Sequence, residues 1–197
     1  MSINRRQALK QAAYFMGGAL SAPTIMGVMQ GCSAEAKASW VPSFFSEPQA
    51  ITVQELAETI LPATDTKGAI ELGVPQFIEQ MVGVVYGEKD RDLFMEGLAS
   101  FEAMIEEKYG SSFSALSKED RLSVAKELNS KMQDPANQPA SGEPRPFFWT
   151  FKELTVAGYF TTEYGATQVL QYQIVPGAFN GCMPIEEAGD GGRTYAV

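Results

Sequence analysis

The feature that most constrains the fold is an aromatic-rich stretch at residues 147–184, which reads FFWTFKELTVAGYFTTEYGATQVLQYQIVPGAFNGCMP. Four of its residues recur at i, i+4, i+7 and i+11, the spacing of one face of an α-helix: Phe147, Phe151, Leu154 and Gly158. Other aromatic side chains lie off that stripe, so the segment is apolar on more than one side: Phe148, Trp149, Tyr159, Phe160, Tyr164 and Tyr172. Such a helix must be covered on several sides. It is either the central core helix of a small domain, or a core helix that also meets a partner subunit through Phe147 and these six aromatic residues.

Length and charge set the next limits. The chain has 197 residues, which is enough for one domain and removable ends. Its net charge is −9, and residues 1–32 hold three of the 15 basic residues and none of the 24 acidic ones. Removing them leaves a charge of about −12, which argues against nucleic acid or anionic lipid as the main partner.

Several kinds of active site are excluded by composition. The chain has no histidine, which excludes Ser-His-Asp and Cys-His relays and histidine-ligated metals or haem. Its cysteines are Cys32 and Cys182, too few for a zinc or C-x-x-C-H haem site. Neither a dinucleotide fingerprint nor a P-loop occurs. We therefore expect no catalytic, cofactor-binding or metal site in this chain.

The first 32 residues predict export. Arg5 and Arg6 precede an uncharged, glycine-containing run at residues 11–31, which is typical of a twin-arginine signal read by the twin-arginine translocon. An uncleaved anchor helix is the alternative, and Pro23 disfavours it. Residues 28–32, V-M-Q-G-C, resemble a lipobox, which predicts lipidation of Cys32 and a membrane tether. Otherwise Cys32 remains a thiol or pairs with Cys182, and Cys182 is in turn a free thiol or pairs with another chain.

The remainder predicts an all-α fold of about five to six helices in a domain at 51–184, between a spacer at 33–50 and a flexible tail at 185–197. Trp40, Phe44 and Phe45 are expected to fix the end of the spacer to the domain. Helix starts are predicted at Thr52 (a capping box with Glu55), residue 73, residue 90 and Ser117. The third helix is expected to end at Gly110, and Thr161 or Thr162 is expected to cap a last helix reaching Tyr172. A loop at 134–146 holds four prolines and separates the fourth helix from the aromatic one.

Five motifs in this order resemble the gluconate 2-dehydrogenase subunit 3 family: the twin-arginine leader, P-A-T-D-T-x-G-A, G-V-P-x-F-I, K-E-L-T-V-x-G-Y-F-T-T-E-x-G and Y-x-x-x-P-G-x-F-x-G-C. The resemblance implies a non-catalytic small subunit of a periplasmic, membrane-associated sugar or polyol dehydrogenase. Its large partner would be an FAD-dependent flavoprotein of the glucose–methanol–choline type, exported on this chain's leader. A c-type cytochrome carrying haem c is often the third subunit of such complexes.

Two other functions remain open from the residues alone. One is a stand-alone helical envelope lipoprotein that binds a small ligand or an envelope component, which predicts a stable monomer. The other is an enzyme that uses paired carboxylates such as Asp65 and Glu163. A turn-stabilising role for Asp65 and an amide-capping role for Glu163 are the simpler interpretations of these two residues.

Overall fold

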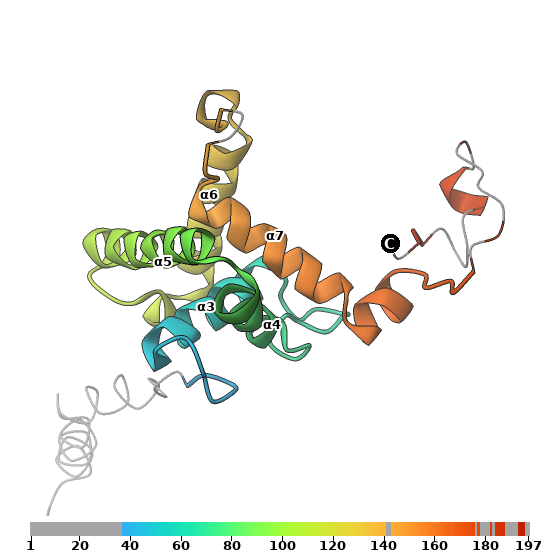
Figure 1. The fold of residues 1–197 in the computed structure, drawn as a ribbon, viewed down its shortest axis with the longest axis horizontal. Helices are drawn as coiled ribbons and strands as arrows, with labels where there is room; N and C mark the ends of the chain where they lie inside the picture. Colours follow the sequence, from blue (N-terminus) through green and yellow to red (C-terminus); the bar gives the residue numbers. More distant parts are fainter. Residues whose placement is uncertain are drawn as a thin grey trace, which may run out of the picture. The chain divides into compact units, whose positions relative to one another are not determined.

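The computed structural model describes residues 37–140, 143–175, 177, 182, 184–187 and 193–195, so Arg5, Arg6 and Cys32 lie outside the described residues. The α-helices in Figure 1 are α3 (Glu47–Ile60), α4 (Val74–Gln80), α5 (Glu88–Tyr109), α6 (Lys118–Gln133) and α7 (Phe147–Phe160). A π-helical turn, Met81–Val85, continues α4. Within the described part of the chain the only β pairing is an isolated bridge between Gln171 and Tyr195. The all-α prediction is confirmed.

The start of α3 differs from the prediction. The helix begins at Glu47 behind Ser46, whose backbone N–H donates to Gln49 Oε1 at 3.0 Å. Thr52 and Glu55 match a capping box in sequence, yet they lie inside the helix and bond to other helices: Thr52 Oγ1 donates to Glu102 Oε1 of α5, and Glu55 forms an ion pair with Arg121 of α6. The predicted cap was wrong because Ser46 and Gln49 form a capping box six residues earlier, which leaves Thr52 and Glu55 inside the helix and free to bond to other helices.

Other helix ends follow local signals. Ser117 Oγ accepts the backbone N–H of Asp120 at 3.1 Å, which confirms the predicted start of α6. Gly110 ends α5 with φ of +66°, a left-handed conformation that glycine adopts at little cost. The loop before α7 is interrupted by one 3₁₀ turn, Pro135–Asn137.

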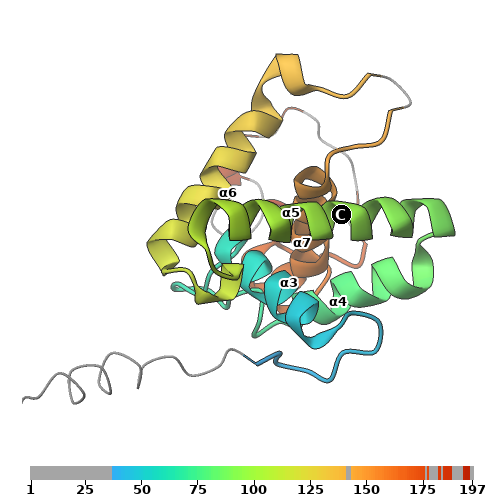
Figure 2. The same cartoon turned by 90° about the vertical axis from the view of Figure 1, so that its left-hand side faces the viewer.

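Helix α7 is the centre of the core, and it contacts α3, α4, α5 and α6 (Figure 2). Two glycines allow close contacts between α7 and its neighbours. A Cβ at Gly97 of α5 would lie 2.5 Å from Cβ of Phe147 in α7, and a Cβ at Gly158 of α7 would lie 2.6 Å from Cδ1 of Phe77 in α4. Phe151 is completely buried. The prediction of a central aromatic helix is confirmed.

The segment before α3 is fastened to α4 by Glu79. Its Oε1 accepts the backbone N–H groups of Ser43 (2.8 Å), Phe44 (2.8 Å) and Phe45 (3.1 Å), and its Oε2 accepts Trp40 Nε1 at 2.7 Å. We call this arrangement the Glu79 clasp. It confirms that Trp40, Phe44 and Phe45 fix the spacer to the domain.

After α7 the chain makes a shorter helical element than predicted. Thr162 Oγ1 accepts the N–H of Gly165 at 3.0 Å, and a π-helical turn then runs over Gly165–Val169 and stops before Tyr172. The backbone N–H of Gln171 donates to Thr194 O at 2.8 Å, so part of the tail returns to this turn. Among the described residues, no helix has the length and hydrophobicity that crossing a bilayer requires.

Candidate partner-binding cleft

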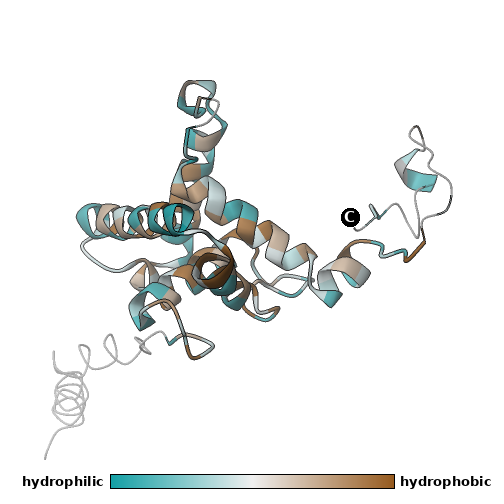
Figure 3. Cartoon of the chain, in the orientation of Figure 1, coloured by the Kyte–Doolittle hydropathy of each residue, from teal (hydrophilic) through white to brown (hydrophobic). Residues whose placement is uncertain are grey.

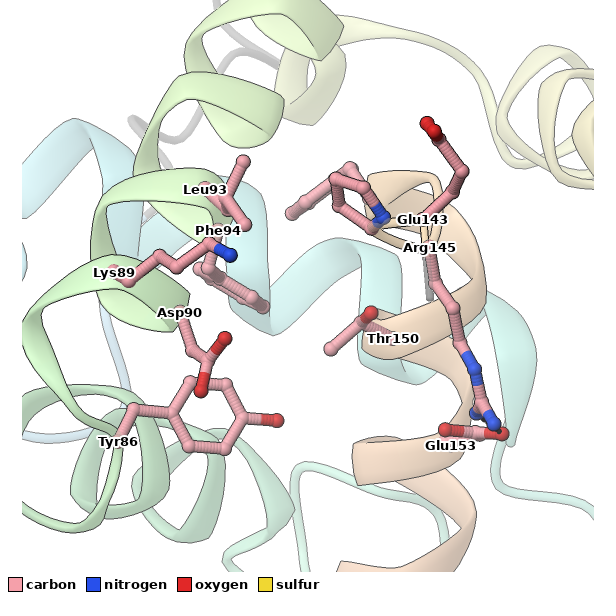
Figure 4. Close-up of a pocket in the computed structure, with 11 residues that line it drawn as sticks. Tyr86, Lys89, Asp90, Leu93, Phe94, Glu143, Arg145, Thr150 and Glu153 are labelled. Carbon is pink, nitrogen blue, oxygen red and sulfur yellow. Dashed lines mark hydrogen bonds and ion pairs between the residues drawn. The ribbon is translucent and has the colours of Figure 1, made fainter. Parts of the chain in front are cut away.

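A cleft of about 440 Å³ lies between the first half of α5 and the start of α7 (Figure 4). One wall comes from the start of α5 and from Tyr86, two residues before it, and the other comes from α7 and the end of the proline-rich loop. The lining residues are Tyr86, Lys89, Asp90, Leu93, Phe94, Glu143, Pro144, Arg145, Phe147, Thr150 and Glu153. Two stretches that lie about 50 residues apart in the sequence therefore build one site.

The apolar part of the cleft is continuous with the core. Phe94 is buried, and its ring packs edge-on against Phe147 with 5.2 Å between ring centroids. Leu93 adds an aliphatic side chain beside them. Because these rings are fixed by core packing, an incoming apolar side chain would meet a rigid surface.

A ring of polar side chains surrounds this apolar part. Figure 4 shows Lys89 and Asp90 on the α5 side, facing Thr150 and Glu153 on the α7 side. Arg145 forms an ion pair with Glu153 and places its guanidinium 5.8 Å from the centroid of the Trp149 ring. These contacts attach the end of the proline-rich loop to α7 and define that edge of the cleft.

Tyr86 supplies a hydroxyl to the cleft. Burial, with further contributions from the charges of Asp90 and Glu153, raises the pKa of Tyr86 above its ordinary value. The phenol therefore stays protonated at neutral pH and can donate a hydrogen bond. Among the described residues, no group of three His, Cys, Asp or Glu side chains could hold a metal ion.

An apolar centre with a mixed-charge rim is the usual anatomy of a protein–protein contact. The volume of the cleft suits one or two protruding side chains, and the rim offers both hydrogen-bond donors and acceptors to the backbone around them. The arrangement can therefore recognise a partner chain by shape and by hydrogen bonding.

Comparison with known protein families matches residues 47–177 to gluconate 2-dehydrogenase subunit 3. The chain belongs to this family. The matched residues include α3 to α7 and every residue that lines the cleft. No match is found among curated proteins or among solved structures. The resemblance inferred from the sequence motifs is thus confirmed, and it places the cleft within the family's shared domain.

The seven aromatic residues predicted to meet a partner differ in how far they are buried. Phe148 and Tyr159 are buried in the chain's own core, and Tyr159 also donates its hydroxyl to Lys67 O at 2.8 Å. Tyr172 is 59% exposed. The others are half-buried: Phe147, Trp149, Phe160 and Tyr164. Phe147 lines the cleft and Trp149 lies beside its lining residue Arg145, whereas Phe148 and Tyr159 pack in the core of this structure.

The other residues considered in the sequence are Asp65, Glu163 and Cys182. Asp65 and Glu163 are exposed, and no hydrogen bond connects them in the part of the chain that the structure describes. The turn that contains Asp65 is held instead by Glu58, which accepts the N–H groups of Ala63 (3.0 Å) and Ile70 (2.9 Å). Cys182 is exposed.

Sequence reasoning missed the cleft and the Glu79 clasp. The signal for the clasp was present, because Glu79 is the one charged residue in the apolar stretch at 74–86. A lone carboxylate in such a stretch indicates a buried group with hydrogen-bond donors around it. The cleft carries no comparable local signal, since its walls come from separate helices.

Proposed function

We propose that this chain is the accessory subunit of an exported, membrane-associated dehydrogenase complex, and that its main partner is an FAD-containing flavoprotein of the glucose–methanol–choline type. The family match over residues 47–177 is the observation that carries the proposal. Membership of a subunit 3 family indicates an accessory role beside other subunits of a gluconate dehydrogenase complex. In this proposal the oxidation chemistry belongs to the flavoprotein, and haem c belongs to a cytochrome subunit.

The cleft between α5 and α7 is the proposed docking point for the flavoprotein. Rigid apolar rings at its centre can bury a partner side chain, and Thr150, Asp90 and the Tyr86 hydroxyl can bond to the surrounding backbone. The half-buried Trp149 would extend this contact along α7.

The leader gives the accessory subunit a second task. Arg5 and Arg6 would direct the folded complex through the twin-arginine translocon, so that a flavoprotein without a signal crosses bound to this chain. Lipidation of Cys32 would then keep the complex at the periplasmic face of a membrane.

Two experiments test these statements separately. Replacing Arg5 and Arg6 by lysine should leave both this chain and the flavoprotein in the cytoplasm, as measured by fractionation and immunoblotting. Export of the flavoprotein in that variant would contradict the carrier role.

The docking point is tested by filling the cleft. Thr150→Trp places an indole among the lining residues, and we expect it to weaken flavoprotein binding at least about tenfold, or about 1.4 kcal/mol. Ser123→Trp on the exposed face of α6 is the matched control and should bind normally. Equal affinities of the two variants, measured by titration in detergent, would exclude the cleft as the docking point.

A further inference from the structure

Two contacting segments at one edge of the domain are poor in charge. Residues 38–46 and 74–86 contain a single charged side chain, Glu79, and it is buried in its clasp. In the whole chain 20% of residues are charged. The two segments are in direct contact, because Phe44 packs on Gly83 so closely that a Cβ there would lie 2.8 Å from Phe44 Cγ.

Three valines project from this edge into solvent. Val41 is 92% exposed, Val84 is 81% exposed and Val85 is 64% exposed. We call Val41, Val84 and Val85 the valine edge. Figure 3 shows hydrophobic colouring over the segment before α3 and over the end of α4 and its π-helical turn.

The exposure of these valines is imposed by the fold. The Glu79 clasp holds the backbone of residues 43–45 and the Trp40 indole on either side of Val41. Val84 and Val85 belong to the π-helical turn, whose next residue, Tyr86, turns towards the cleft. Exposed apolar side chains that are grouped on contacting segments mark a surface that another surface covers.

The valine edge lies close in sequence to Cys32, and this proximity indicates which surface covers the edge. Lys37 is the first described residue, and its carbonyl accepts Gln54 Nε2 at 3.3 Å, so the chain is fastened to α3 there. Lys37 follows Cys32 by only five residues. Five residues span at most about 18 Å. A lipid attached at Cys32 would therefore hold this end of the domain against the bilayer.

We propose that the valine edge rests in the headgroup region of the membrane that carries the lipid anchor, so that the domain is oriented on the bilayer as well as tethered to it. This inference rests on the lipidation of Cys32 in the proposed function. The contact is apolar, since a chain with a net charge of about −12 after removal of its leader gains nothing from anionic headgroups. Shallow burial of aliphatic side chains at the headgroup boundary supplies such a contact.

Lipid is favoured over the flavoprotein as the cover. Protein contacts normally place polar and charged groups around an apolar centre, as the cleft does. Within segments 38–46 and 74–86 no charged residue is exposed, and the nearest exposed charges in sequence, Lys37, Glu47 and Glu88, lie at their ends. The edge also begins next to the tether, where the bilayer is closest.

The test uses the full chain with its co-purified subunits in phosphatidylcholine vesicles. Cys182→Ser removes the exposed thiol, and Val41→Cys, Val84→Cys or the control Ser123→Cys on α6 then carries an environment-sensitive fluorophore. We expect quenching by doxyl-labelled phosphatidylcholine at positions 41 and 84 with protection from aqueous iodide. Position 123 should show the reverse.

Three other results would count against the membrane contact of the valine edge. Iodide quenching at positions 41 and 84 equal to that at 123 would overturn the proposal. Protection from both quenchers would also overturn it, because a partner subunit would then cover the valines. Labelling of Cys32 in the Cys182→Ser background, seen by mass spectrometry of the labelled peptide, would show that the lipid tether itself is absent. Co-purification of the flavoprotein in the same preparation reports on the accessory role independently.

Discussion

The Glu79 clasp provides the sharpest test of the energetic account. Replacing Glu79 by alanine deletes four hydrogen bonds to a carboxylate and leaves the buried N–H of Phe45 without its partner. The other three donors are only partly buried, so water can replace some of what they lose. Net values of about 1.5–3 kcal/mol for a bond to a charged group, reduced by this rehydration, give a cost of about 3–5 kcal/mol.

The clasp also predicts a pH dependence. Burial alone would raise the pKa of Glu79, but the hydrogen bonds from Phe44, Trp40, Phe45 and Ser43 together lower it below the ordinary value of 4.5. A carboxyl group whose pKa is lower in the folded state stabilises the fold above its unfolded pKa, and this stability is lost as pH falls through the folded pKa. The difference in stability between wild type and Glu79→Gln should therefore shrink when the pH is lowered below 4.5.

Urea unfolding followed by circular dichroism measures both effects. Glu71→Gln is the control, because Glu71 is an exposed glutamate whose ion pair with Lys67 lies on the surface, and its stability should match that of wild type. Losses below about 1 kcal/mol in both Glu79→Ala and Glu79→Gln would refute the reasoning, since four partnered donors cannot be lost so cheaply. An unchanged difference between wild type and Glu79→Gln at low pH would refute the assignment of the charged form.

Three further substitutions test the packing and the helix ends. Gly158→Ala forces a methyl group to within 2.6 Å of Phe77 and should cost about 1–3 kcal/mol in urea unfolding. The control Gly87→Ser has nothing within 4 Å of the added Cβ and keeps a residue suited to the N-cap of α5, so it should cost less than about 0.5 kcal/mol. Equal costs would contradict the close approach of α4 and α7. Ser117→Ala removes the cap of α6 and should lower the free energy of unfolding by about 1 kcal/mol, and restoration by Ser117→Asp would show that the cap is responsible. Phe151→Ala empties a fully buried site in α7 and should cost about 3–5 kcal/mol, so wild-type stability in this variant would contradict a central α7.

Features that depend on neighbours in sequence were predictable. The Ser117 cap, the Gly110 terminus and the apolar stripe of α7 each depend on a few consecutive residues, and the structure confirms all three. Thr52 shows the limit of such signals. It occupies a good capping position, but its hydroxyl bonds to Glu102, which lies 50 residues later in the chain.

The candidate site depends on long-range contacts. The clasp joins Glu79 to residues 34 to 39 positions earlier, and the cleft joins α5 to a loop about 50 residues later in the sequence. A periodic pattern of apolar residues shows that a helix has a buried side, but it does not say which helix covers that side. For the same reason Phe148 and Tyr159 looked like interface residues, and the structure places them in the core.

The proposed role as the accessory subunit of a flavin-dependent dehydrogenase complex can be tested on the native complex. The most direct measurement is gentle detergent extraction of the tagged full-length chain from its native membranes, followed by affinity purification and an absorption spectrum. We expect a large co-purifying chain with the absorption bands of oxidised flavin, bleached on addition of the complex's sugar or polyol substrate. A colourless monomer without a partner would contradict it and would favour a stand-alone envelope lipoprotein.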